Sequence, residues 1–323
     1  MGIAFVFPGQ GSQDVGMGKE LAAAHSAARE VFDEVDAALG QKLSALMWEG
    51  PKDTLTLTEN AQPAIMAVSL AVMRVLEKEH GFDIGRSVKF VAGHSLGEYS
   101  ALAAAGTFSL ADTARLLKLR GQAMQKAVPV GQGAMVALLG VGLDAARLVA
   151  EAAARPGGAG QENPDVCQVA NDNEPTQVVL SGHKTAIDRV ADVGKALGVR
   201  RALPLPVSAP FHCSLMQPAA DAMAEALSTV TMRAPSVPVI SNVLASAISD
   251  PADIRRRLVE QVTGTVRWRE SVEYMAKNGI THVFEIGHGK VLAGLVKRIE
   301  KSLEATSIGA PADIVTALPS LKI

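Results

Sequence analysis

The stretch VAGHSLGEYS, residues 91–100, places a glycine on either side of a serine. The apolar residues before Gly93 favour a short buried strand, and the residues from Glu98 onward favour a helix. Residues 93–97 have the spacing G-x-S-x-G of a nucleophile elbow, a sharp strand-to-helix turn that exposes the serine oxygen at a helix N-terminus. The same residues also suit a glycine-rich loop with a capping serine, so the pattern alone leaves both interpretations open.

Composition narrows the class of protein. The chain has 323 residues, a formal net charge of −2, 48% hydrophobic residues and 4% aromatic residues. It can therefore bury a sizeable core, and it lacks the basic excess usual in nucleic-acid binders. The only cysteines, Cys167 and Cys213, support neither a disulfide framework nor a zinc site. They suit a reducing cytoplasmic compartment, and no uncharged stretch has the length and apolarity of a membrane span.

Apolar runs of strand length alternate with segments of helical period through most of the chain. Strands are predicted at residues 3–7, 89–92, 237–241 and 282–286, and helices at roughly 18–39, 61–80, 110–127, 214–230, 251–262 and 290–301. This alternation predicts an α/β fold whose parallel sheet is covered by helices on both faces. Ligands of such sheets bind at the carboxyl ends of the strands.

The middle of the chain has a different order of elements. Strands are predicted at residues 133–139, 166–171, 177–181 and 199–205, with helices at 143–154 and 184–197. The order β-α-β-β-α-β is typical of a ferredoxin-like arrangement, whose ends approach each other. We therefore predict a small domain at residues 128–199, inserted into a discontinuous α/β domain formed by residues 1–127 and 200–323.

A nucleophilic serine requires an oxyanion hole. One expected donor is the N–H of Leu96, the residue after the serine. The other is expected from FPGQGSQ, residues 7–13, where glycines let the backbone around Gln10 approach a ligand closely. A dinucleotide fingerprint, G-x-G-x-x-G, is the alternative for this loop, and it fails because Asp14 occupies the last glycine position.

The general base has two comparable candidates among the histidines. His212 lies in PVSAPFHCSLM, residues 206–216, and His288 lies in EIGHGKV, residues 285–291. Both segments read as strand-to-helix loops, and the chain order of α/β hydrolases would favour the later histidine. No aspartate is marked clearly as a third member of a triad.

Arg120 is the cation on the apolar face of its predicted helix, because its neighbours one turn away are Leu116, Leu117, Ala123 and Met124. A buried guanidinium needs an anionic partner. That partner is either an internal carboxylate in a salt bridge or the carboxylate of a substrate, held by two parallel hydrogen bonds.

Together these residues resemble the malonyl-CoA:acyl carrier protein transacylase family of fatty acid synthesis. The matching segments include FVFPGQGSQ (5–13), GHSLGEYSAL (93–102), RGQAMQKAVP (120–129) and RALPLPVSAPFHCSLM (201–216). The resemblance extends over nearly the whole chain and implies a hydrolase-like parallel-sheet core with a ferredoxin-like insert. His288 departs from the family pattern, since many relatives have proline there.

The resemblance implies a role for each matching residue. Ser95 would be the acyl nucleophile and His212 its base, with the N–H groups of Gln10 and Leu96 as the oxyanion hole. The residues implied at the substrate are Arg120, which would hold the malonyl carboxylate, and Phe211, Gln261 and Asn171. Gln261 would also help to orient the histidine.

The implied reaction is a ping-pong transfer of malonyl from malonyl-CoA to the phosphopantetheine thiol of acyl carrier protein, without metal or bound cofactor. The alternatives are a trans-acting acyltransferase of polyketide synthesis, a serine hydrolase or thioesterase with the same elbow, and a non-catalytic carrier-binding module. Carrier proteins of this type are acidic, so docking requires a local basic patch. The candidate cations are Lys184, Arg189, Lys195, Arg200 and Arg201, which also suit an ordinary solvated helix face.

Overall fold

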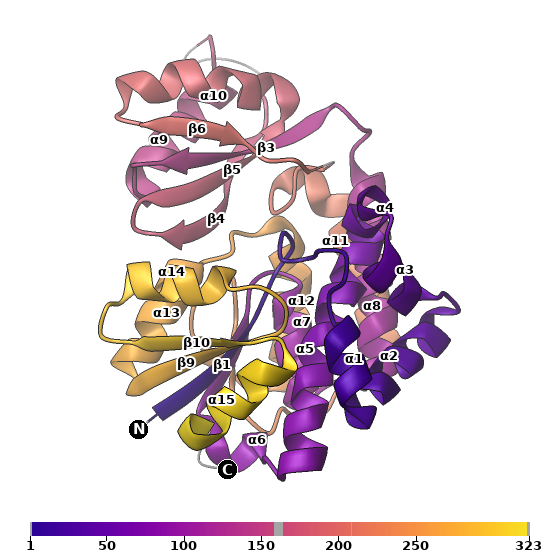
Figure 1. Ribbon diagram of the computed structural model, residues 1–323. Helices are drawn as coiled ribbons and strands as arrows, with labels where there is room; N and C mark the ends of the chain where they lie inside the picture. Colours follow the sequence, from indigo (N-terminus) through magenta and orange to yellow (C-terminus); the bar gives the residue numbers. More distant parts are fainter. Residues whose placement is uncertain (1, 158–163, 208, 322–323) are drawn as a thin grey trace.

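Two β-sheets, one above the other in Figure 1, organise the computed structural model, which describes residues 2–157, 164–207 and 209–321. The larger sheet has the strand order β10-β9-β1-β2-β7-β8. Its strands are β1 (Gly2–Phe7), β2 (Phe90–Gly93), β7 (Val239–Ile240), β8 (Ala247–Ile248), β9 (Ile280–Ile286) and β10 (Glu304–Ile308). Every pairing is parallel except that of β7 with β8, which confirms the predicted α/β class.

Strand β1 shows why this sheet is buried on both faces. Its side chains alternate between the faces, as the two-residue period of a strand dictates. Ile3, Phe5 and Phe7 pack in the core that includes α5 (Thr58–His80), whereas Ala4 and Val6 pack in the core formed with α13 (Trp268–Lys277) and α14 (Val291–Ile299). A hydrophobic strand without a polar alternation is therefore the expected pattern.

Helices lie on both sides of the large sheet and extend to the right of it in Figure 1. The remaining ones are α1 (Lys19–Ala24), α2 (Ser26–Leu39), α3 (Leu43–Glu49), α4 (Lys52–Thr56), α6 (Ile84–Ser87), α7 (Gly97–Ala104), α8 (Leu110–Ala127), the 3-10 helix η1 (Ser214–Met216), α11 (Gln217–Thr229), α12 (Pro251–Thr263) and α15 (Pro311–Leu321). None of the described helices combines the length and apolarity needed to cross a membrane.

The single helix predicted at residues 18–39 is wrong, because α1 and α2 are separate helices. His25 between them is extended, with φ −130° and ψ 120°. Its Nδ1 atom lies 2.7 Å from Oε2 of Glu79 on α5. The helical period continues across the break in the sequence, so this tertiary contact is not visible in the pattern of apolar residues.

The smaller sheet has the order β4-β5-β3-β6 and is antiparallel throughout. Along the chain its elements are β3 (Gly133–Leu139), α9 (Leu143–Ala154), β4 (Cys167–Glu174), β5 (Gln177–His183), α10 (Lys184–Ala196) and β6 (Arg201–Pro204), which is the predicted order β-α-β-β-α-β. Helices α9 and α10 pack on one face of this sheet. The division of the chain into domains stays a prediction, and β6 pairs with β3 although it begins beyond the predicted boundary at residue 199.

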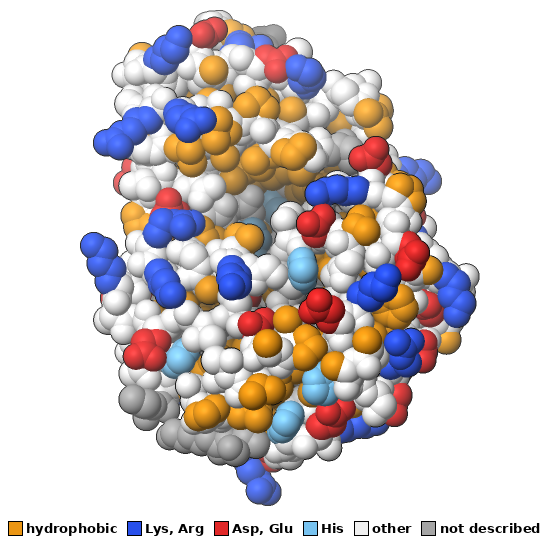
Figure 2. Space-filling view, viewed as in Figure 1, with side chains coloured by type: hydrophobic (Ala, Val, Ile, Leu, Met, Phe, Trp, Pro, Cys, Tyr) orange, Lys and Arg blue, Asp and Glu red, His pale blue; other side chains and the backbone are white. Residues whose placement is uncertain are grey.

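Strand β4 joins the smaller sheet to the larger unit. Asn171 forms a parallel bridge with Val266. Oδ2 of Asp172 accepts a hydrogen bond from Nη2 of Arg269 at 2.8 Å, and Oε2 of Glu174 lies 3.0 Å from Nε of Arg298. Between the two units Figure 2 shows a hollow, which corresponds to a cavity of about 410 Å³.

Candidate active site

Ser95 stands on a strained turn between β2 and α7, with a left-handed φ of 54°. Both flanking glycines are required sterically. A Cβ on Gly93 would lie 1.9 Å from the carbonyl carbon of Gly97, and a Cβ on Gly97 would lie 2.2 Å from the carbonyl oxygen of Phe7. The serine hydroxyl faces the cavity rather than capping the helix, which favours the nucleophile-elbow interpretation.

His212 is the histidine that meets the serine. Its Nε2 atom lies 2.7 Å from Oγ of Ser95, and its Nδ1 atom lies 2.8 Å from the main-chain carbonyl oxygen of Gln261. Because a carbonyl only accepts, Nδ1 carries the proton and Nε2 is free to accept one from the serine. His288 is not among the residues that line the cavity, so of the two candidates only His212 is placed to act as the base.

The histidine is poised as a neutral base. Its side chain is buried, and burial followed by the positive charge of Arg120 lowers the pKa of His212 to about 3. A neutral imidazole has a lone pair for the serine proton, whereas an imidazolium does not. The main-chain carbonyl of Gln261 therefore takes the place of a triad aspartate, and it orients the ring without adding a negative charge.

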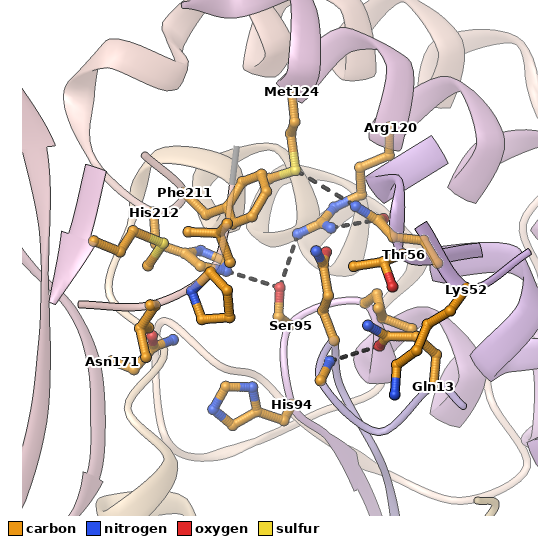
Figure 3. A pocket seen from close by; sticks show the side chains of 18 residues that line it. Gln13, Lys52, Thr56, His94, Ser95, Arg120, Met124, Asn171, Phe211 and His212 are labelled. Carbon is orange, nitrogen blue, oxygen red and sulfur yellow. Dashed lines mark hydrogen bonds between the residues drawn. The ribbon is translucent and has the colours of Figure 1, made fainter. Parts of the chain in front are cut away.

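Arg120 of α8 lies on the opposite side of the serine from His212, as Figure 3 shows. Its Nη1 donates to Oε1 of Gln62 at 2.8 Å, and its Nη2 donates to Oε1 of Gln261 at 2.8 Å and to Oγ of Ser95 at 3.2 Å. The guanidinium is 1% exposed, and within the described chain its direct partners are neutral. An internal salt bridge, one of the two expectations, is therefore absent from the described residues, and a buried cation faces the cavity.

The predicted oxyanion donors lie on loops that pack together. A Cβ on Gly9 would lie 2.7 Å from the carbonyl oxygen of His94, so the loop after β1 needs this glycine to reach the elbow. Gln10 and Leu96 both line the cavity. Among the described residues, neither of their backbone N–H groups has a hydrogen-bond acceptor, which leaves both available to a ligand oxygen.

The other predicted substrate residues divide into two groups. Phe211 and Asn171 line the cavity, the first from the loop before His212 and the second from β4 (Figure 3). Gln261 is fully buried and does not line it. Its side chain and carbonyl instead hold Arg120 and His212, which favours a positioning role over direct substrate contact.

Three buried polar residues of the site were missed by sequence reasoning: Gln62, Glu98 and Asn242. Oδ1 of Asn242 accepts the Ser95 N–H at 2.8 Å. Asn242 follows β7, the neighbour of β2, so a polar residue just past a predicted buried strand was an available signal. Gln62 and Glu98 lie within otherwise apolar helices, which was a second signal.

The chain is similar to known proteins along almost its full length. Residues 4–318 match the model of the acyl transferase domain family. A malonyl CoA-acyl carrier protein transacylase of Escherichia coli O157:H7 is 47% identical over 315 residues, covering 98% of both chains. That of Bacillus subtilis strain 168 is 43% identical over 320 residues, covering 99% of this chain and 97% of the relative.

Solved structures show the same similarity. An acyl-carrier-protein-S-malonyltransferase from Bartonella henselae is 54% identical, covers 100% of both chains and superposes with a TM-score of 0.95. A second structure holds a malonyl-transacylase in complex with a type II PKS acyl-carrier protein. It is 41% identical, covers 99% of this chain and 100% of its own, and has a TM-score of 0.93.

Proposed function

Because the chain belongs to the malonyl-CoA:acyl carrier protein transacylase family, we propose that it transfers malonyl from malonyl-CoA to the phosphopantetheine thiol of an acyl carrier protein through an ester on Ser95. This acyltransferase reaction supplies fatty acid synthesis. The observation that carries the assignment to this site is the convergence on one serine hydroxyl of a neutral histidine at 2.7 Å and a buried arginine at 3.2 Å.

The first half-reaction forms the acyl-enzyme. Nε2 of His212 takes the proton from Ser95, whose oxygen attacks the thioester carbonyl of malonyl-CoA. The N–H groups of Gln10 and Leu96 donate to the oxyanion that develops. As the carbon–sulfur bond breaks, the imidazolium returns the proton to the departing sulfur, and coenzyme A leaves as a thiol.

The second half-reaction is the reverse with a new thiol. His212 takes the proton from the phosphopantetheine sulfur, which attacks the malonyl ester. The Ser95 oxygen leaves and regains the proton, so the enzyme returns to its starting state. The same pair of residues therefore serves both steps, because each is an exchange between a hydroxyl and a thiol at one carbonyl carbon.

Arg120 accounts for the choice of acyl group. A malonyl group carries a carboxylate next to the reacting carbonyl, and a cation held rigidly in a cavity with little water binds it far better than a neutral methyl group. We propose that this bond also orients the ester toward the thiol. A serine hydrolase with the same elbow would release free malonate instead.

The proposed chemistry draws only on side chains and backbone groups of this protein, so we propose that malonyl-CoA binds as substrate and that no metal or other cofactor takes part. We also propose a cytoplasmic location, supported by the two cysteines, Cys167 and Cys213, which are buried and free. Both thiols have pKa values raised by burial, as expected of structural rather than reactive cysteines.

The test is intact mass spectrometry after mixing with malonyl-CoA, followed by addition of a phosphopantetheinylated carrier protein. We expect a malonyl adduct that is absent from Ser95→Ala, and its disappearance as malonyl-carrier forms. Accumulation of free malonate at the rate of adduct loss, without malonyl-carrier, would assign a hydrolase. No adduct on the wild-type protein would assign a non-catalytic binding module.

A further inference from the structure

Glu98 is an acid behind the nucleophile that the proposed chemistry does not use. It lies in the first turn of α7 and is 1% exposed. Its Oε2 accepts hydrogen bonds from Nε2 of Gln261 at 2.7 Å and from the N–H of Asn242 at 3.3 Å. A buried carboxylate costs free energy unless its partners compensate, so these contacts need an explanation.

The contacts of the Gln261 side chain fix its amide in one orientation. An arginine only donates and a main-chain carbonyl only accepts, so Oε1 must face Arg120 and Nε2 must face the carbonyl of Ser95, which it meets at 3.0 Å. Glu98 adds a charged acceptor on the same Nε2. A reversed amide would set its N–H₂ against the guanidinium and its oxygen against the carboxylate, which both partners disfavour.

Through this amide, Glu98 reaches the cation of the site. Arg120 has two neutral anchors, Gln62 at one end of its fork and Gln261 at the other. The negative charge of Glu98 acts on the guanidinium across the intervening amide and compensates it without occupying its donors. A direct salt bridge would stabilise Arg120 as well, but it would leave less of the fork for a substrate carboxylate.

We propose that Glu98 is a positioning residue for acyl-group selectivity: it aims the Arg120 guanidinium at the substrate carboxylate through the side-chain amide of Gln261. This inference rests on the proposed malonyl transfer. It predicts a specific defect, because a misdirected guanidinium weakens the handling of a carboxylated acyl group and matters little for an uncharged one.

The experiment compares single-turnover acylation of Ser95 by malonyl-CoA and by acetyl-CoA in matched variants, read by intact mass. In Glu98→Leu we expect the ratio of malonyl to acetyl rates to fall by about tenfold or more, a typical coupling for a charged hydrogen bond. Glu98→Gln retains an acceptor of the same shape and should recover most of the ratio. The control is Ser100→Ala, on the same helix, whose buried hydroxyl has no described hydrogen-bond partner and whose loss should change neither rate.

A second variant keeps the test decisive if Glu98→Leu does not fold. Gln261→Leu breaks the same path from its other end and should lower the same ratio, and where Glu98→Leu folds, the double variant should lower it no further than either single change. Equal losses of malonyl and acetyl rates in folded variants, or additive losses in the double variant, would overturn the positioning role. Failure of the wild-type protein to form a malonyl ester would instead overturn the proposed function.

Discussion

Ser95 and His212 share a hydrogen bond of 2.7 Å and the same unusual backbone conformation, with φ angles of 54° and 57°. Left-handed backbone costs a non-glycine residue about 1–2 kcal/mol, so it persists only where other contacts impose it. Here Asn242 accepts the Ser95 N–H, and Gln261 binds both the Ser95 carbonyl and the His212 ring. The reacting pair is therefore held by its surroundings rather than by local preference.

The first prediction separates the two candidate bases. His212→Ala should lower the rate of malonyl transfer by about 10²–10⁴-fold, since it removes the proton acceptor of Ser95. His288→Ala should change it by less than about threefold, because His288 does not line the cavity. Both rates are measured by the mass shift of the carrier protein. Comparable losses in the two variants would return the assignment of the base to an open choice.

Arg120→Ala should cost malonyl acylation of Ser95 about 2–5 kcal/mol, because it leaves a buried substrate carboxylate without its cation. Acetyl acylation should fall much less, since acetyl carries no carboxylate. The change in the ratio of the two rates is the diagnostic measurement. An equal fall for both acyl groups would mean that Arg120 supports the fold and that the carboxylate is bound by another group.

Phe211 lines the acyl cavity beside His212 and is buried. Phe211→Ser enlarges the cavity, so we expect it to relax exclusion of methylmalonyl-CoA relative to malonyl-CoA. A methyl-sized discrimination in an apolar pocket is worth about 1–3 kcal/mol. The ratio of acylation rates with the two thioesters measures it. An unchanged ratio would leave Phe211 with a packing role only.

Carrier docking is expected at Arg200 and Arg201, both exposed and without a described carboxylate partner, beside the strand that leads into the cavity wall. Lys184 and Arg189, considered from sequence for the same patch, already pair with Asp188 and Asp165. Reversal of Arg200 and Arg201 to Glu should slow transfer to an acidic carrier about tenfold, most strongly at low salt, and leave acylation by malonyl-CoA nearly unchanged.

The control for docking is Arg86→Glu on α6, an exposed arginine that Figure 1 shows at the opposite end of the molecule from the smaller sheet. It changes net charge by the same amount per residue without altering the expected docking face. If Arg86→Glu slows transfer as much as either reversal at Arg200 or Arg201, the effect reflects overall charge rather than a docking patch.

Glu98 should make stability depend on pH. Burial raises the pKa of Glu98 from 4.5 to about 7. The folded protein therefore binds more protons than the unfolded chain between these values, and the free energy of unfolding falls as pH rises through this window. Between about pH 5 and 8, the wild-type protein should lose about 2 kcal/mol relative to Glu98→Gln in denaturant titrations. A difference that is constant with pH would show that Glu98 stays ionised.

The sequence by itself determined the features that depend on neighbours along the chain. Gly93 and Gly97 mark the elbow because steric exclusion acts between residues a few positions apart. The apolar face of α8 marks Arg120, because helical period is local. The alternation of strands and helices marks the α/β core and the order of elements in the smaller sheet, because hydrophobic burial imposes a period on each element.

Only the tertiary structure decided which distant groups meet. His212 and His288 are equivalent as sequence patterns, and their distance from Ser95 depends on how the loops after separate strands converge. The acceptor for His212 Nδ1 is a main-chain carbonyl, which every residue possesses, so no residue type could announce it. Glu98 and Gln261, 163 residues apart, form one network because close packing places a charged acceptor and an amide side by side. Hydrogen bonds of that kind follow from three-dimensional geometry, which a one-dimensional pattern does not contain.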